Sequence, residues 1–204
     1  MDGLLIVMSG FSGAGKGTLL KSVMSQYDNY VFSVSMTTRS PREGEVDGKD
    51  YFFVDRQTFE KTIEEDGLVE HAEYCGNYYG TPKAYIERKL KEGMNVILDI
   101  EVMGATQIKK KFPNALMIYV VPPSIEILRE RLSKRGSETK EVIDKRLLKA
   151  KEECEFISDY EYIIVNDDLE EAKKKFINIV DTARQAVFRN NDFINELKQE
   201  LESV

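Results

Sequence analysis

Short runs of apolar and β-branched residues alternate with longer segments of helical periodicity along most of the chain. Five runs have the length and composition of buried strands, and most are followed by a helical segment. This alternation is typical of a parallel sheet with helices on both faces. The expected strands are residues 4–8, 30–35, 95–100, 116–121 and 162–165. The expected helices are one ending near residue 26 and those over residues 102–111, 124–134, 140–157 and 169–188. The sequence therefore predicts an α/β fold.

Residues 36–82 interrupt this alternation. Two short strand-like stretches and a short helix are expected there, over residues 51–54, 68–79 and 56–66. Gly76-Asn77 is suited to a turn between antiparallel strands. Thr81 precedes Pro82 and is the expected N-cap of the following helix. The whole segment is predicted to be a small inserted α+β subdomain.

Two further helical segments are expected to lie outside the sheet. Residues 126–158 are predicted to form a helical lid, and residues 190–204 a C-terminal helix with apolar side chains at helical spacing. That helix is expected to pack on its own domain or on a partner subunit, so the protein is predicted to be a monomer or a homodimer. The remaining segments form the core of a single domain, about residues 1–35, 83–125 and 159–189.

The composition argues against several classes of protein. The chain has 204 residues, of which 42% are hydrophobic and 32% charged, as in globular proteins. A formal charge of −7 argues against duplex nucleic acid as the partner. No apolar run reaches the roughly 20 residues that a membrane helix needs. Two cysteines and one histidine argue against a disulfide framework and a histidine-based zinc site. We therefore expect a cytoplasmic protein without nucleic-acid or membrane partners.

A glycine-rich segment follows the first expected strand and opens the first helix. It reads Gly10-Phe11-Ser12-Gly13-Ala14-Gly15-Lys16-Gly17-Thr18. The spacing Gly-x4-Gly-Lys is that of the P-loop, whose backbone N–H groups surround phosphates while the lysine reaches the β- and γ-phosphates. An ordinary strand-to-helix turn is the alternative. Gly17 replaces the usual Ser or Thr after the lysine, so Thr18 is expected to bind a phosphate and Mg²⁺ to be held largely through water.

Further motifs follow in a fixed order. They are S-V-S-M-T-T-R-S-P-R at 33–42, G-K-D-Y-F-F at 48–53, Glu70 with G-N-Y-Y-G-T at 76–81, I-L-D-I at 97–100, P-P-S at 122–124, and Arg135-Gly136 with Arg146-Leu147. Together with the P-loop, this series resembles the guanylate kinase family over about residues 3–188. The resemblance implies a P-loop NTPase-type fold in which residues 36–82 bind GMP. It also implies transfer of the γ-phosphoryl group of ATP to GMP, giving ADP and GDP, with Mg²⁺ accompanying ATP.

The resemblance implies a GMP site made of Ser35, Arg39, Arg42, Tyr51, Glu70, Tyr79 and Thr81, and the positions of Asp99 and Glu101 add these two residues to it. Arginine binds phosphate oxygens in pairs and tyrosine donates to them without adding charge, which suits these residues to the GMP phosphate. The carboxylate of Glu70 can accept the two neighbouring N–H donors of guanine, which adenine lacks. Ser35 and Thr81 can serve other atoms of the base edge. The alternatives are a surface carboxylate at Glu70 and ion pairs of Arg39 and Arg42 with the nearby Glu43 and Glu45.

Asp99 ends an apolar strand. Ligands of open α/β sheets bind beyond the carboxyl ends of the strands, so Asp99 is expected to face the phosphates. It could orient hydrated Mg²⁺ or contact the acceptor nucleotide, and a helix N-cap is the alternative. Glu101 is expected to assist on the guanosine side.

The resemblance implies a catalytic set of Lys16, Arg39, Arg131, Arg135 and Arg146. Residues 129–149 contain eight basic and four acidic residues, which indicates either a site for a small polyanion or a solvated helical face. Phosphoryl transfer needs positive charge around the transferred group, and arginines on a closing lid supply it. Salt bridges to Glu130, Glu138 or Asp144 are the alternative. Asn166 is implied on the ATP side, with helix capping as the alternative.

Two other functions are the alternatives to phosphorylation of GMP. A non-catalytic guanylate-kinase-like binding module would not need Lys16, the intact P-loop or the lid arginines. A P-loop kinase for another small phosphate ester is disfavoured by the combination of Glu70 and Ser35.

Overall fold

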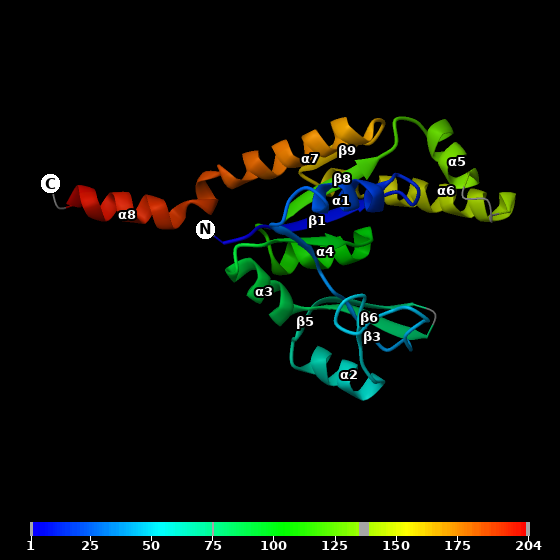
Figure 1. Ribbon diagram of the computed structural model, residues 1–204, viewed down its shortest axis with the longest axis horizontal. Coiled ribbons are helices and arrows are strands. Elements are labelled where there is room, and N and C mark those ends of the chain that lie inside the picture. Colours follow the sequence, from blue (N-terminus) through cyan, green and yellow to red (C-terminus); the bar gives the residue numbers. More distant parts are fainter. Residues whose placement is uncertain (1, 75, 135–138, 203–204) are drawn as a thin grey trace.

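The computed structural model describes residues 2–74, 76–134 and 139–202, and these residues form two sheets (Figure 1). The larger sheet has five parallel strands in the order β2-β7-β1-β8-β9. Its strands are β1 (Leu5–Gly10), β2 (Tyr30–Phe32), β7 (Asn95–Asp99), β8 (Leu116–Val121) and β9 (Tyr162–Val165). The predicted parallel sheet is confirmed, although β2 ends before Ser35.

Helices cover both faces of the larger sheet. In Figure 1, α1 and α7 lie on one face, and α3 and α4 lie on the other. These helices are α1 (Lys16–Met24), α3 (Lys83–Lys91), α4 (Val102–Lys111) and α7 (Leu169–Arg184). Successive side chains of a strand point to opposite faces. Ile6 and Met8 of β1 accordingly lie in the core beneath α1 and α7, while Leu5 and Val7 lie in the core beneath α3 and α4. Burial on both faces explains why residues 5–8 of this strand form an unbroken apolar run.

The second sheet has the order β4-β3-β6-β5 and lies below α3 and α4 in Figure 1. Its strands are β3 (Met36–Thr37), β4 (Phe52–Phe53), β5 (Leu68–Tyr74) and β6 (Asn77–Pro82). Helix α2 (Arg56–Glu64) lies between β4 and β5 in the sequence. The pairs β5–β6 and β3–β6 are antiparallel, and β3–β4 is parallel. Phe59 of α2 is fully buried and stacks on the ring of Tyr78. The expected N-cap was wrong: Pro82 precedes α3, and the hydroxyl of Thr81 bonds to Glu70 instead.

The lid segment contains α5 (Ile125–Ser133) and α6 (Lys140–Cys154). The helix expected to reach residue 157 ends at Cys154, and a short 3₁₀ helix follows over Ile157–Asp159. Similarly, α7 ends at Arg184 and is followed by a 3₁₀ helix over Val187–Arg189.

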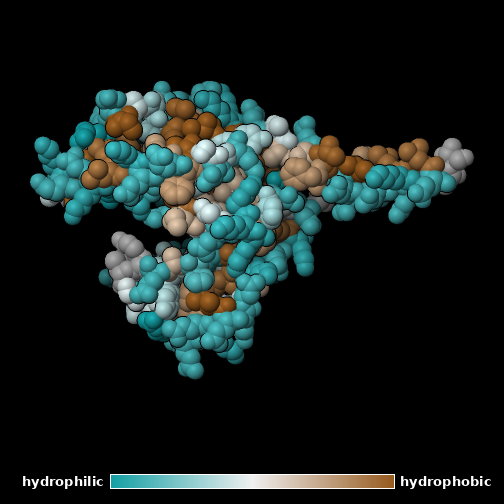
Figure 2. Space-filling view, turned by 180° about the vertical axis from the view of Figure 1, so that it is seen from behind, coloured by the Kyte–Doolittle hydropathy of each residue, from teal (hydrophilic) through white to brown (hydrophobic). Residues whose placement is uncertain are grey.

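The C-terminal helix α8 (Asn191–Glu202) extends away from the rest of the chain (Figure 1). None of its described residues is buried, so the structure does not show the packing on its own domain that was one of the two expectations, and packing on a partner subunit stays a prediction. Phe193, Leu197 and Leu201 are exposed, and Figure 2 shows apolar side chains along one edge of this helix. Across the described part of the chain, no helix has the length and apolarity needed to cross a bilayer.

Candidate active site

The P-loop joins β1 to α1 at the carboxyl edge of the larger sheet. Gly13 and Gly15 have φ angles of +94° and +91°, in the left-handed region that glycine adopts without steric cost. A Cβ atom on Gly15 would lie 2.4 Å from Nδ2 of Asn166, so a side chain has no room there. Gly15 immediately precedes α1, and the free N–H groups of a helix N-terminus favour an anion. The loop therefore has the backbone geometry of a phosphate site.

Lys16 is held inside this loop. Its Nζ donates a hydrogen bond to the carbonyl oxygen of Gly10 at 2.6 Å and lies 3.9 Å from Oδ1 of Asp99. Only 17% of the lysine side chain is exposed. Burial raises the pKa of Asp99, and the charge of Lys16 opposes that shift. The N-cap position of α4 is occupied by Glu101, so Asp99 is not the helix cap that was considered as its alternative role.

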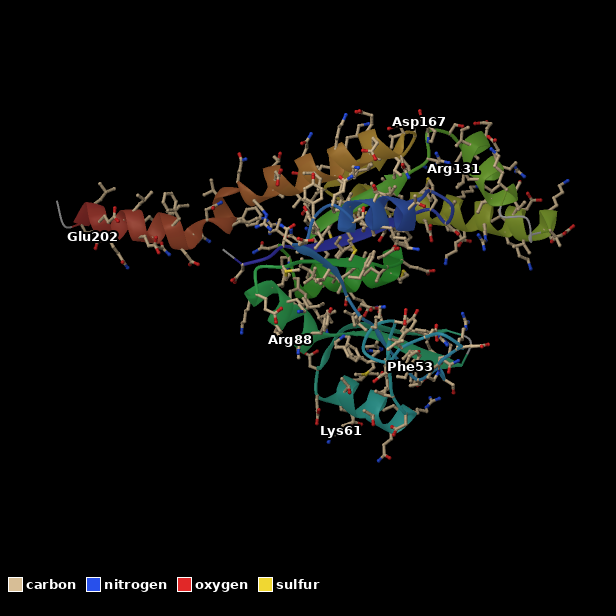
Figure 3. All side chains as sticks on the ribbon, viewed as in Figure 1. Phe53, Lys61, Arg88, Arg131, Asp167 and Glu202 are labelled. Atoms are coloured by element: carbon tan, nitrogen blue, oxygen red, sulfur yellow. The ribbon has the colours of Figure 1, made fainter. Side chains whose placement is uncertain are left out.

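Asn166 and Arg131 support the P-loop through hydrogen bonds to backbone carbonyl groups. Nδ2 of Asn166 donates to the carbonyl oxygen of Ala14 at 2.8 Å, and the residue is only 6% exposed. Nη1 of Arg131 donates to the carbonyl oxygen of Asn166 at 2.9 Å and lies 3.4 Å from that of Ala14. Asp168 caps α7, so the capping alternative for Asn166 is wrong. Figure 3 shows Arg131 on α5, close to the loop that contains Asp167.

Glu70 lies on β5 of the second sheet. Its Oε1 accepts a hydrogen bond of 2.6 Å from the hydroxyl of the buried Thr81, and burial raises its pKa. Its Oε2 faces α4, 3.4 Å from the position that a Cβ of Gly104 would occupy. The carboxylate is thus enclosed between the second sheet and α4, which rules out the surface alternative. A cavity of about 320 Å³ nearby is lined by residues that include Ser35, Tyr51, Thr81 and Asp99.

Arg39 is restrained by an acid and two aromatic rings. Its Nη2 donates to Oε1 of Glu45 at 2.8 Å, and its guanidinium lies 5.3 Å from the ring centre of Tyr51 and 5.7 Å from that of Phe53. The hydrogen bond with Glu45 is the main reason that the pKa of Arg39 is raised. The backbone N–H of Arg42 donates to Oε2 of Glu45 at 2.7 Å, and the backbone N–H of Glu45 donates to the carbonyl oxygen of Arg42 at 3.1 Å. The ion pair considered for Arg39 is therefore present.

Tyr79 belongs to the same group as Arg39. Its ring centre lies 6.1 Å from that of Tyr51 in an edge-on arrangement. Tyr79 also contributes to the raised pKa of Arg39, after Glu45. Tyr51, Tyr79 and Arg39 therefore form one cluster on the second sheet.

The lid approaches the P-loop through α6. Nη1 of Arg146 lies 3.4 Å from Oγ of Ser12, and both residues line a cavity of about 270 Å³ that also borders Lys16, Asp99 and Glu101. Two of the acidic residues suggested as partners of the lid arginines pair with other lid residues, as Arg129–Asp144 and Lys134–Glu130. Arg135, expected to be catalytic, and Glu138, its suggested partner, lie outside the described residues.

Asp99 lies where the cavities meet. It lines the cavity beneath the lid, the cavity beside Ser35 and Tyr51, and a third of about 370 Å³ against the P-loop. The third cavity is bordered by Thr18 and by most of the loop glycines. An open recess separates the second sheet from the lid side of the molecule in Figure 2.

Sequence reasoning missed several residues that border these cavities. Lys149 and Glu153 line the cavity beneath the lid, and Lys49 and Asp50 line the one beside Ser35. The only sequence signal for Lys149 was the excess of basic residues over 129–149. Glu153 carried no signal, because its place near the P-loop depends on how α6 crosses the core.

Comparisons with known proteins agree with this geometry. Residues 3–183 match the model of the family described as guanylate kinase. The guanylate kinase of Desulfitobacterium hafniense (strain Y51) is 51% identical over 178 residues, which cover 87% of this chain and 89% of that protein. The guanylate kinase of Caldanaerobacter subterraneus subsp. tengcongensis is 45% identical over 199 residues, covering 98% and 97%.

A solved structure gives the same result. The crystal structure of guanylate kinase from Anaplasma phagocytophilum matches with a TM-score of 0.70 and 33% sequence identity, over 92% of this chain and 89% of that one. The P-loop, the enclosed Glu70 and the lid arginines lie within the matched region. This chain therefore belongs to the guanylate kinase family and is an enzyme that transfers a phosphoryl group from ATP to GMP, giving ADP and GDP.

Proposed function

We propose that the cavities on either side of Asp99 receive the two substrates of this reaction, ATP against the P-loop and GMP against the second sheet. The observation that carries the proposal is that Asp99 borders all three cavities. A phosphoryl group passing between the two nucleotides would then cross directly in front of this carboxylate. The division into a core, a GMP-binding insertion over 36–82 and a lid over 126–158 is part of the same proposal.

On the ATP side, Lys16 and the backbone N–H groups of residues 10–18 would bind the phosphates. Asn166 would act indirectly, because its amide holds the carbonyl of Ala14 and so supports the shape of the loop. Arg131 supports the same segment through the carbonyl of Asn166.

Mg²⁺ is proposed to accompany ATP. Asp99 and Thr18 border one cavity and offer the oxygen ligands that this cation prefers. The cation would be held mainly by the phosphates of ATP and by water. When bound, the cation neutralises charge on the phosphates.

On the GMP side, Glu70 would accept hydrogen bonds from the guanine edge. The bond from Thr81 fixes one carboxylate oxygen and so orients the group before the base arrives. Ser35 lines the cavity that Thr81 also borders and can serve a neighbouring atom of the base. Adenine offers no matching pair of donors, so Glu70 would keep only the hydrogen bond from Thr81, and this loss is the physical basis of the proposed preference for guanine.

The phosphate of GMP would be bound by polar groups on and beside the second sheet, namely Arg39, Arg42, Tyr51 and Tyr79. Glu45 holds Arg39 in place, which reduces the conformational entropy lost when a phosphate binds. Glu101, at the N-terminus of α4, would also contact GMP.

The chemistry requires positioning and charge rather than a covalent intermediate on the protein. The bond from the γ-phosphorus to the leaving oxygen of ADP breaks while a bond to a phosphate oxygen of GMP forms. Lys16, Arg39 and the lid arginines Arg131, Arg135 and Arg146 would stabilise the charge that develops on the transferred group. Closure of the lid would exclude water and limit hydrolysis of ATP.

A coupled assay of ADP release tests the proposal, with GMP, AMP, UMP and dTMP as acceptors. Rapid ADP release with GMP and little with the others is expected. Faster release with another acceptor would favour a kinase for a different phosphate ester. Absence of ADP release with every acceptor would favour a non-catalytic binding module.

We infer that the protein works in the cytoplasm, as a monomer or a homodimer. Cys154 is an exposed free thiol, which suits a reducing compartment. Light scattering of the purified protein separates the two oligomeric states.

A further inference from the structure

Helix α6 of the lid contacts both sides of the site with residues that lie one turn apart. Nη1 of Arg146 reaches Oγ of Ser12 in the P-loop at 3.4 Å. Three residues later, Nζ of Lys149 donates to Oε1 of Glu101 at 2.7 Å. Residues separated by three positions lie on the same face of a helix, so a single face of α6 meets both the P-loop and the N-terminus of α4.

Glu101 lies at the N-terminus of α4, where the helix dipole favours a negative charge. It is the N-cap residue of α4, yet its side chain makes no hydrogen bond to its own helix. Its carboxylate instead meets a lid residue that is 48 positions away in sequence.

Lys149 lies between two acids. Besides its bond to Glu101, its Nζ lies 3.9 Å from Oε1 of Glu153, whose side chain is only 12% exposed. All three residues line the cavity that contains Lys16 and Asp99. The positive charge of Lys149 therefore lies beside the cavity where the lid, the P-loop and the N-terminus of α4 meet.

We propose that Lys149 is a positioning residue that orients Glu101 toward bound GMP and links the lid to the acceptor side. The proposal rests on the function given above, in which Glu101 faces GMP. Lys149 holds Oε1 of Glu101, which leaves Oε2 to accept a hydrogen bond from the nucleotide. Arg146 contacts the P-loop from the same face of α6. A single position of the lid would therefore place Arg146 beside ATP and Lys149 beside the residue that faces GMP.

The size of the effect follows from the exposure of the pair. The side chains of Lys149 and Glu101 are 50% and 71% exposed. Exposed ion pairs change an equilibrium constant by at most about five-fold. Loss of the pair should therefore leave the fold intact and raise the KM for GMP by up to about five-fold, with little change in the KM for ATP.

The test compares Lys149→Met with Lys151→Met, a matched change at an exposed lysine on the same helix that borders none of the three cavities. The KM for each nucleotide, kcat and the melting temperature are measured for the full chain. Lys149→Met should raise the KM for GMP selectively, while Lys151→Met should behave like the wild type. Lys149→Arg, which keeps the charge, should restore most of the affinity.

A double-mutant cycle with Glu101→Gln completes the test. If the two residues act together, the double variant should be no worse for GMP than Glu101→Gln alone. Three outcomes would each overturn the proposal. The first is equal kinetics for Lys149→Met and Lys151→Met, and the second is additive effects in the cycle. The third is an equal rise in both KM values together with a lower melting temperature. Failure of the wild type to phosphorylate GMP would instead overturn the proposed function.

Discussion

The ammonium of Lys16 lies 3.9 Å from the carboxylate of Asp99, at the carboxyl ends of the neighbouring strands β1 and β7. This separation exceeds hydrogen-bond length, and the lysine donates to the carbonyl of Gly10 instead. The two charges are therefore close without forming a tight pair. Each keeps its capacity for ligands, the lysine for phosphate and the carboxylate for a hydrated cation.

Replacing Lys16 by alanine is expected to lower kcat by about 10²- to 10³-fold, because one preorganised charge at the transferred group is lost. Steady-state kinetics with ATP and GMP measure the effect, and circular dichroism checks the fold. Lys198→Ala, at an exposed position of α8, is the control. A near-normal kcat for Lys16→Ala would remove this residue from the mechanism.

Asp99→Asn is expected to raise the Mg²⁺ concentration needed for half-maximal rate and to lower kcat by about ten-fold or more, since a charged oxygen ligand is replaced by a neutral one. The rate is measured against Mg²⁺ at fixed ATP and GMP. Asp28→Asn, at an exposed site, serves as the control. An unchanged dependence on Mg²⁺ would contradict a role of Asp99 at the cation.

Glu70→Gln is expected to raise the KM for GMP by about ten- to hundred-fold while the KM for ATP stays nearly constant, because the neutral amide offers one acceptor in place of two. Discrimination against AMP should fall as well. Glu73→Gln, on the same strand and exposed, is the control. Unchanged acceptor preference would reject guanine recognition by Glu70.

The raised pKa of Glu70, caused by burial, predicts a pH dependence of GMP binding. Guanine needs the charged carboxylate, so affinity should fall as pH decreases through this raised pKa, above the ordinary range of a glutamate. The stability of the free protein depends on pH in the opposite direction. Glu70 contributes fully to the free energy of unfolding below the ordinary carboxyl pKa, and this contribution is lost as pH rises through the raised pKa.

Calorimetric titration of GMP at several pH values checks this dependence. Glu70→Gln retains the titration of the GMP phosphate but lacks that of the carboxyl, so the difference between the two proteins isolates Glu70. Parallel curves for wild type and variant would show that Glu70 does not govern the pH response.

Asn166→Ala is expected to reduce the free energy of unfolding by about 1–3 kcal/mol, because the carbonyl of Ala14 loses a buried hydrogen-bond donor. The KM for ATP should rise more than the KM for GMP, since the change lies behind the P-loop. Chemical denaturation and steady-state kinetics measure the two effects. A loss of stability with equal changes in both KM values would assign Asn166 a purely structural role.

The sequence alone predicted the elements whose signals are local. The helix over residues 102–111 and the strand over residues 116–121 were predicted with their observed bounds, because side-chain periodicity follows the backbone geometry of each element. The P-loop was equally clear. Its glycines, lysine and helix start are contiguous, so its conformation depends on few residues outside it.

The tertiary structure alone decided which residues support the site. Asn166 meets Ala14 across 152 positions, and Lys149 meets Glu101 across 48. Thr81 looked like a helix cap in sequence but bonds to Glu70, because β5 and β6 pair and bring the two side chains together. Such contacts depend on the order of the strands and on how the lid crosses the core, and no short window of sequence contains that information.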